Sequence, residues 1–256
     1  MTPRIPSRDR HTRKPRAARA HTSLAAVVTG LLTTASLAVA APADAARAPS
    51  AGTVVGLWHM DEAPGAGTMV DSSGLGHNGT ISTGVTTGTP SDDGTTGYTF
   101  TQTGGVVRVP NDSTLNPGTS PLTLSIHLRM AANVPAGDYN VVEKGTATAT
   151  GGAYKLEINA THTGPKFGFP DCAFNGATGS HAKAFAPASI LDGKWHVVTC
   201  HLNTTQAWVE LDGHSGKTVA WQGDSIANSA DLTIGAKPNA THGYVGDADE
   251  ATLVIG

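Results

Sequence analysis

The ten residues PLTLSIHLRM, Pro121 to Met130, alternate apolar and polar side chains without a break. The apolar members occupy every second position: Leu122, Leu124, Ile126, Leu128 and Met130. A period of two is that of a β-strand with one face in a core and the other toward solvent. The segment therefore predicts a half-buried strand.

The same pattern predicts further strands along the chain. It returns in AYKLEINA (153–160), and KWHVVTCHLN (194–203) and AWVELDG (207–213) are separated by a short turn, which predicts a hairpin. Seven more short strands are expected at Val54–Met60, Gly105–Pro110, Asn140–Lys144, Lys166–Phe169, Thr218–Trp221, Leu232–Gly235 and Ala248–Ile255. Gly-rich turns at short spacing between strands are typical of a sandwich or barrel, so we expect one all-β domain.

The first 45 residues differ in composition from the rest of the chain. A basic leader precedes the apolar run SLAAVVTGLLTTASLAVA, and small residues follow it at once. This layout predicts a secretory signal peptide, cleaved after Ala45, and an exported product in the cell wall or outside the cell. The alternative is a membrane-spanning helix, for which the run is at the short end. We expect residues 46–53 to be a short lead-in and 54–256 to be the domain.

Removal of the leader leaves 10 basic against 18 acidic residues. An acidic domain does not attract phosphate backbones or anionic lipid, which argues against nucleic acid and membrane partners. The two cysteines, Cys172 and Cys200, lie in this part of the chain. In an exported protein an even number of cysteines predicts a disulfide, the alternative being two buried thiols.

Five segments occur in an order that resembles a known family: GLWHMDEAPGAGTMVDSSGLGHNGTI, YNVVEKG, DGKWHVVTC, VELDG and LTIGAKPNATHGYVGDADEATLVI. Together they resemble the laminin-G-like branch of the concanavalin A-like lectin/glucanase superfamily. They are most similar to its standalone exported forms in actinobacteria. The resemblance implies a jelly-roll β-sandwich of two antiparallel sheets, in which the first and last strands pair.

The segment VDSSGLGHNGTI (70–81) is rich in oxygen-bearing side chains. Asp71 offers a carboxylate and Asn78 an amide oxygen, the ligands that calcium prefers. The resemblance implies that the C-terminal strand adds Asp249 or Glu250. We therefore expect a structural calcium here. The alternative is a metal-free corner in which Asp and Asn cap their own turns.

The superfamily includes glucanases, which place two catalytic carboxyls on one strand in a pattern like E-x-D-x-x-E. The sequence contains no match to this pattern. Glu157 and Glu210, both expected on outer strand faces, form a weaker candidate pair, and solvated surface carboxylates are the better interpretation. We therefore expect no enzyme activity.

Trp208 is expected on the solvent face of its strand, where a flat ring can stack on a sugar. A covering loop, or a strand register shifted by one residue, would remove that role. The expected function is an exported lectin-like domain that binds carbohydrate or glycoprotein. Two alternatives are a glycan-cleaving enzyme of the same fold and a structural or protein-adhesion module.

Overall fold

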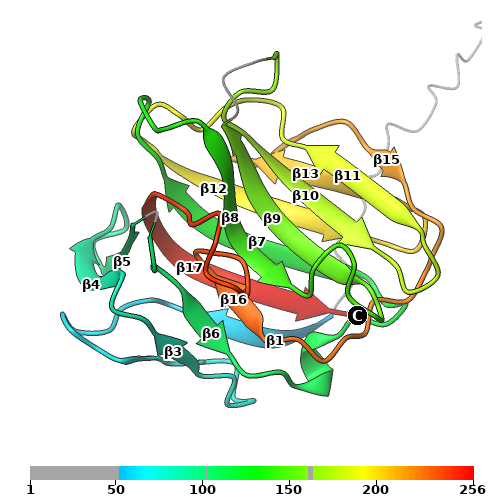
Figure 1. Ribbon diagram of the computed structural model, residues 1–256, viewed down its shortest axis with the longest axis horizontal. Helices are drawn as coiled ribbons and strands as arrows, with labels where there is room; N and C mark the ends of the chain where they lie inside the picture. Colours follow the sequence, from blue (N-terminus) through cyan, green and yellow to red (C-terminus); the bar gives the residue numbers. More distant parts are fainter. Residues whose placement is uncertain (1–51, 102, 161–163) are drawn as a thin grey trace, which may run out of the picture. The chain divides into compact units, whose positions relative to one another are not determined.

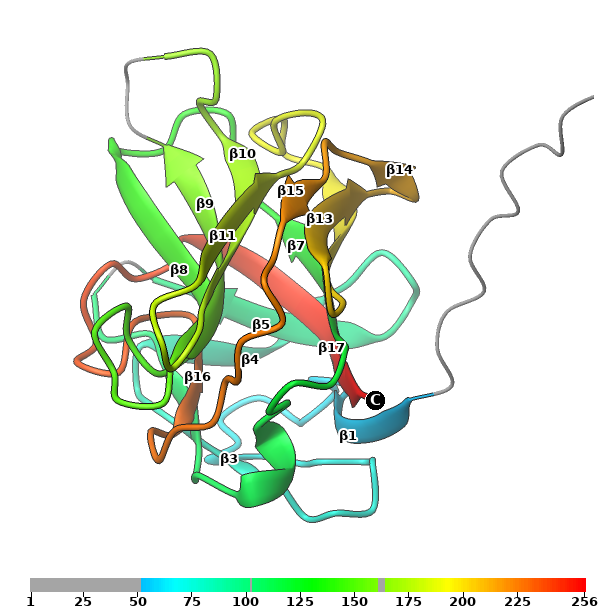
Figure 2. The same ribbon diagram turned by 90° about the vertical axis from the view of Figure 1, so that its right-hand side faces the viewer.

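The computed structural model describes residues 52–101, 103–160 and 164–256, so the predicted signal peptide and most of the lead-in lie outside the described residues. The described residues form two antiparallel β-sheets that share one apolar core (Figure 1). Figure 2, turned by 90°, separates the layer that contains β8, β9 and β10 from the layer that contains β7, β13 and β17. This arrangement confirms the expected concanavalin A-like sandwich.

The first layer, sheet A, has the strand order β14-β13-β12-β7-β17-β5-β4, with β1 paired to β17 and β15 to β13. Its strands are β1 (Thr53–Trp58), β4 (Val85–Pro90), β5 (Thr96–Phe100), β7 (Leu122–Arg129), β12 (Trp195–Leu202), β13 (Gln206–Leu211), β14 (His214–Ser215), β15 (Val219–Ala220) and β17 (Gly246–Ile255).

The second layer, sheet B, has the order β11-β10-β9-β8-β16-β6-β3-β2. Its strands are β2 (Thr68–Met69), β3 (Gly79–Ile81), β6 (Val107–Val109), β8 (Gly137–Lys144), β9 (Ala153–Ala160), β10 (Phe169–Asn175), β11 (His181–Phe185) and β16 (Leu232–Ile234). A 3-10 turn, η1 (Ser113–Leu115), links β6 to β7. Among the described residues, no helix has the length and apolar character needed to cross a membrane.

The alternation in β7 places its apolar side chains in the core between the sheets. Leu124, Ile126 and Leu128 are at most 1% exposed, and Leu156 and Ile158 of β9 are fully buried in the same cluster. Each such side chain stabilises the fold by about 1.5–3 kcal/mol relative to an exposed position. The polar residues of β7 face outward and form part of the outer face of sheet A.

β17 is an interior strand with neighbours along both edges. β7 pairs with one edge, and the other edge pairs first with β5 and then with β1. The change of neighbour coincides with a β-bulge between Asp249 and Thr252, where Glu250 has a positive φ of 48°. The pairing of β1 with β17 confirms that the first and last strands of the domain lie side by side (Figure 1).

The strands predicted from alternation are present, but the segment Lys166–Phe169 is not one. It forms a turn that ends at Phe169, and the strand is β10, the seven residues from Phe169 to Asn175. Gly164 and Gly168 both have positive φ, which favours a turn. In β10 the inward-facing residues are buried, and so are Asp171 and Ala173, which face outward. Exposed and buried side chains therefore do not alternate along this strand.

Cys172 and Cys200 form the predicted disulfide, with Cα atoms 5.8 Å apart. Cys172 lies in β10 of sheet B and Cys200 in β12 of sheet A. The bond therefore crosses the core and ties the two layers together.

We predict that the double variant Cys172→Ala/Cys200→Ala loses stability. The bond closes a loop with a sequence separation of 28, and removal of such a link lowers the free energy of unfolding by about 3–4 kcal/mol in the chain-entropy model. Urea unfolding of the oxidised parent and the variant measures the loss. The reduced parent is the control and should unfold near the variant. Equal midpoints for all three would contradict the prediction.

Candidate functional site

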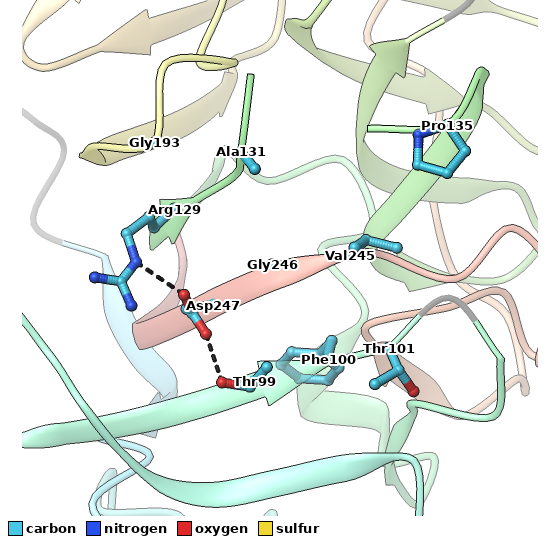
Figure 3. A pocket seen from close by; sticks show the side chains of 10 residues that line it. All are labelled: Thr99, Phe100, Thr101, Arg129, Ala131, Pro135, Gly193, Val245, Gly246 and Asp247. Atoms are coloured by element: carbon cyan, nitrogen blue, oxygen red, sulfur yellow. Dashed lines mark hydrogen bonds and ion pairs between the residues drawn. The ribbon is translucent and has the colours of Figure 1, made fainter. Parts of the chain in front are cut away.

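A pocket opens at the end of sheet A where β5 and β7 finish and β17 begins (Figure 3). Its volume is about 540 Å³, within the roughly 300–1,000 Å³ usual for small-ligand sites. Backbone and small apolar side chains make up much of the wall, and charged groups lie on one side. It is lined by Thr99, Phe100, Thr101, Arg129, Ala131, Pro135, Gly193, Val245, Gly246 and Asp247.

The polar side of the pocket is one row of directly paired residues. Asp247 lies opposite Arg129 of β7 and opposite Thr99 of β5. One of its carboxylate oxygens accepts from Arg129 Nε at 2.8 Å, and the other accepts from the Thr99 hydroxyl (Figure 3). Trp195 of β12 extends the row, with its ring centroid 5.0 Å from the Arg129 guanidinium carbon. The aromatic ring and the carboxylate both hold the guanidinium in place.

The start of β17 is built so that the backbone can approach β7 closely. Gly246 has φ 152°, and a Cβ at this position would lie 2.3 Å from the carbonyl oxygen of Arg129. The hydroxyl of Tyr244 donates to the carbonyl oxygens of Arg129 and Asp247. Glycine is therefore required here, and the fully buried tyrosine ties the start of β17 to the end of β7.

Trp208 lies on the outer face of sheet A, as predicted. Its neighbours Ala207 and Val209 are fully buried in the core, whereas Trp208 is partly exposed. The imidazole of His201, directly opposite on β12, stacks on the indole at 4.6 Å with planes 9° apart. The indole N–H donates to Glu210 at 3.3 Å. One face of the ring is thus covered by the chain itself.

Trp208 and the pocket are separate sites. His201 and Trp195 are six residues apart on β12, which is about 20 Å at 3.3 Å per residue. A single sugar ring cannot contact both.

Sheet B carries a cluster of charges on its outer face: Lys155, Glu157, Asp171 and Lys183. Glu157 of β9 and Asp171 of β10 are directly opposite each other. Glu157 accepts hydrogen bonds from Lys155 and, at 2.8 Å, from Lys183, whose ammonium also lies 3.1 Å from Asp171 Oδ1. Both carboxyl groups are buried, with residue exposures of 4% for Glu157 and 0% for Asp171.

The two carboxyls of this cluster have opposite pKa shifts. Burial acts to raise the pKa of Glu157, but the hydrogen bonds from Lys155 and Lys183 outweigh it and lower the pKa. Burial, followed by repulsion from Glu157, raises the pKa of Asp171 to about 8. Near neutral pH the pair therefore favours an ionised Glu157 beside a protonated Asp171.

Two residues on this face carry buried acceptors with no hydrogen-bond partner among the described residues: Asn140 through Oδ1, and Asp171 through both carboxyl oxygens, of which Oδ1 has only the ion pair with Lys183. Asn140 of β8 lies opposite Glu157, so the two residues flank Glu157 in one cross-strand row. Buried polar atoms without protein partners are rare, and a hydroxyl group or a water molecule can supply the hydrogen bond.

The structure separates the two carboxylates considered as a catalytic pair. Glu157 lies in sheet B and Glu210 in sheet A, both on outer faces, so the sandwich stands between them. The expectation of a solvated surface carboxylate is wrong for Glu157, which is buried beneath two lysines. Glu210 is partly exposed and accepts from Ser215 at 2.9 Å.

Asp71 and Asn78 lie together, as predicted. Asp71 Oδ1 accepts from the backbone N–H groups of Leu57 and Ser73, and Oδ2 accepts from the Ser73 hydroxyl and the His77 N–H. Asn78 Oδ1 accepts from the Asp71 N–H at 2.8 Å. Although burial acts in the opposite direction, these donors lower the pKa of Asp71. The corner thus has the hydrogen bonds of the metal-free alternative.

Asp249 and Glu250 lie at the bulge of β17, away from that corner. Asp249 is fully buried and accepts from the Ser91 hydroxyl at 2.5 Å, while Glu250 pairs with His59 at 2.9 Å. Burial raises the pKa of Asp249 to about 6.

The four predicted ligands do not form one shell. Leu57 of β1 bonds to residues 71 and 72 along one edge of that strand, and β17 pairs with its other edge. In the described part of the chain, no group of three or more His, Cys, Asp or Glu is arranged to hold a metal. Calcium binding stays a prediction.

Comparison with known families decides the classification. A laminin-G-type family model, described as the concanavalin A-like lectin/glucanases superfamily, matches residues 100–254. The chain belongs to this superfamily. Membership confirms the resemblance found in the sequence. No curated protein matches the chain.

Solved structures with the fold of this superfamily resemble the chain at low sequence identity. The binding domain of Paraclostridial Mosquitocidal Protein 1 has a TM-score of 0.61 at 14% identity, with 79% of this chain and 48% of that chain covered. Domain 4 of AbnA, an extracellular arabinanase from Geobacillus stearothermophilus solved in complex with arabinotriose, has a TM-score of 0.57 at 11% identity, with coverages of 80% and 93%. The binding domain of Botulinum neurotoxin DC, solved with rat synaptotagmin II, has a TM-score of 0.57 at 13% identity, with coverages of 79% and 48%.

The match to the toxins is partial. The chain spans about half the length of the toxin binding domains but nearly the whole arabinanase domain, 93% of it. At these identities the likeness establishes the fold alone.

Sequence patterns pointed to some of these side chains but not to their sites. Arg129 is the last outward residue of the alternating strand, and Asp247 lies in the acidic run GDADE, in which only Asp249 and Glu250 are predicted site residues. Asp171 lies in a strand that the alternation does not reveal. Their contacts depend on strand order, which a period of two does not specify.

We predict that Asp171→Asn changes how stability depends on pH. Between about pH 4 and pH 8 folded Asp171 keeps a proton that the unfolded chain has released, so its contribution to stability falls as pH rises. Asn cannot ionise, so the free energy of unfolding of the variant minus that of the parent should increase with pH across this window. Urea unfolding at several pH values measures this difference.

The control is Asp138→Asn, which changes an exposed carboxylate on β8 of the same sheet. The free energy of unfolding of this control minus that of the parent should stay constant over the same pH range. A flat difference for Asp171→Asn as well would show that the carboxyl is ionised throughout.

Proposed function

We propose that the chain is an exported, non-catalytic domain that binds carbohydrate or glycoprotein. The observation that carries the proposal is the pocket in Figure 3, because it combines an apolar wall with a few fixed polar groups. Pro135 and Val245 offer apolar surface to the C–H face of a sugar ring. Arg129 and Asp247 offer a donor and an acceptor to adjacent hydroxyls, and each is held by a second contact.

The comparisons support a binding role in different degrees. The arabinanase domain was solved with a bound oligosaccharide, and its match extends over 93% of its length. The synaptotagmin-bound toxin domain matches over only 48%, so its receptor contacts need not lie in the matched half. This difference favours carbohydrate over a protein receptor.

The absence of catalysis is part of the proposal. Glu157 and Glu210 lie on opposite sheets, so they cannot flank one glycosidic bond at the roughly 5–10 Å that glycosidases use. Glu157 is also held by two lysines, which leaves it neither free to attack nor protonated to act as an acid.

We predict that Asp247→Asn weakens binding of neutral oligosaccharides by about tenfold, the effect of losing a charged hydrogen-bond acceptor of ~1.4 kcal/mol. A glycan array identifies the ligand, calorimetry measures the dissociation constants, and a reducing-end assay on the same glycans should show no cleavage. Trp208→Ala tests whether the exposed face of the Trp208 ring is a second binding surface. Its loss of affinity should be the same with or without the Asp247→Asn substitution. Asp138→Asn, in the other sheet, is the control. If Asp247→Asn bound every ligand as tightly as the parent, the pocket would not be the binding site.

A structural calcium at Asp71 belongs to the same proposal. An ion that binds only the folded state stabilises it by mass action, by about 2.7 kcal/mol at a hundredfold excess over the dissociation constant. We predict that calcium raises the melting temperature of the parent relative to chelator, and that Asp71→Ala removes this increment.

The variant also separates the two expectations for the corner. Asp71 accepts hydrogen bonds from Leu57, Ser73 and His77, so its loss lowers the melting temperature even without metal. If Asp71→Ala lowered the melting temperature by the same amount in calcium and in chelator, the corner would be held by hydrogen bonds alone. If the substitution lowered the melting temperature more in calcium than in chelator, the corner would be the metal site.

A further inference from the structure

The outer face of sheet B gathers several of the few cationic side chains of an acidic domain. Residues 52–256 contain nine Lys and Arg against 18 Asp and Glu. Lys166 and Lys183 lie beside two phenylalanine side chains, and Lys155 shares Glu157 with Lys183. These three lysines with Phe169 and Phe185 are called the lysine–phenylalanine patch below.

The patch presents ammonium groups over aromatic rings. Lys166 Nζ lies 4.7 Å from the ring centroid of Phe169 and 5.3 Å from that of Phe185. Lys183 Nζ lies 5.4 Å from the Phe185 ring. Lys166 is exposed and both rings are partly exposed. An incoming ring with an acidic group could therefore contact a phenyl edge and an ammonium at once.

The charge of the patch is positive within an acidic chain. Glu157 takes hydrogen bonds from Lys155 and Lys183. The buried Asp171 is shifted toward its neutral form, because burial and the neighbouring Glu157 both raise its pKa. Glu157, together with Glu143 opposite Lys155, cannot balance three ammonium groups, so the patch is complementary to an anion of low charge. A continuous polyanion such as nucleic acid is disfavoured by the acidic remainder of the chain.

The patch also adjoins buried oxygen atoms that have no hydrogen-bond partner among the described residues. Asp171 lies opposite Phe185 and beneath Lys183, and its Oδ2 has no hydrogen-bond partner among the described residues. Asn140 Oδ1, two strands away in the same row, is likewise buried and unpartnered in the described chain. A hydroxyl both donates and accepts, so it satisfies the Asp171 carboxyl in either protonation state.

We propose that the lysine–phenylalanine patch binds acidic sugars, with a uronate carboxylate on Lys166 and Lys183 and the sugar ring against Phe185. The carboxylate meets the positive charge, C–H groups of the sugar meet the exposed edge of the phenyl ring, and ring hydroxyls face the Asp171 row. The site lies on sheet B, so it is distinct from the pocket of Figure 3, although it rests on the proposed carbohydrate ligand.

The test uses short oligosaccharides of three uronate polymers, polygalacturonate, alginate and hyaluronate, each paired with its carboxyl-reduced neutral form. Calorimetry on the purified chain should show binding of at least one acidic form and weaker binding of its neutral partner. Lys166→Gln should weaken binding of the acidic form by about threefold to fivefold, the size of an exposed ion pair. Lys166→Arg should restore it. Raising NaCl from about 0.05 M to about 0.5 M should reduce the difference between acidic and neutral forms, because the charges are screened.

Matched controls separate this site from the pocket. Lys194→Gln removes an exposed ammonium whose side chain is 78% exposed on the turn before β12, and it should leave binding unchanged. Asp247→Asn should weaken neutral ligands and spare the uronates. Equal affinity for acidic and neutral forms, no binding of any uronate, or an unaltered Lys166→Gln variant would each overturn the proposal. If Asp247→Asn bound neutral ligands as tightly as the parent while Lys166→Gln weakened uronate binding, the proposed pocket site would be ruled out and the patch would remain supported.

Discussion

The pairing of β17 with strands on both of its edges is the constraint on which the candidate pocket depends. In antiparallel sheets, directly opposed residues lie about 4.5–5.5 Å apart, so a row of partners brings together positions far apart in sequence. One such row across sheet A holds Thr99, Asp247, Arg129 and Trp195. Neighbours in this row are at least 66 residues apart in the sequence. The polar side of the pocket therefore exists only if β17 enters the sheet between β5 and β7.

The two outer faces of the sandwich use charge differently. On sheet A the carboxylates of Asp247 and Glu210 are separate from each other and remain partly exposed, Asp247 bonded to Arg129 and Thr99 and Glu210 to Trp208 and Ser215. On sheet B the carboxyls of Glu157 and Asp171 are buried side by side under lysines. Burial of two acids in contact is unfavourable unless one takes up a proton, and the opposite pKa shifts of the pair follow from that cost.

Local periodicity was enough to predict the layers but not the sites. The alternation in 122–130 and 153–160 predicted β7 and β9 and their buried faces, since burial of one face fixes the period of side chains. It failed at 166–175, because β10 is buried on both faces and its glycines form the preceding turn. The neighbours of Arg129, Asp171 and Asp247 follow from strand order and register, which are set by long-range packing. The predicted calcium ligands show the same limit: Asp71 and Asn78, close in sequence, meet, whereas Asp249 and Glu250 lie on the other side of β1.

The hydrogen bonds of the Asp71 corner explain what that segment contributes with or without an ion. Its carboxylate binds the backbone of Leu57, and Trp58 donates its indole N–H to the carbonyl oxygen of His77. The Leu57 contact lies on the edge of β1 that β17 does not use, so it satisfies a backbone group that an edge strand would leave unpaired. The corner thus closes the edge of sheet A beside β1. Because β1 is the lateral support of the second half of β17, the corner also stabilises the strand whose first half forms the pocket.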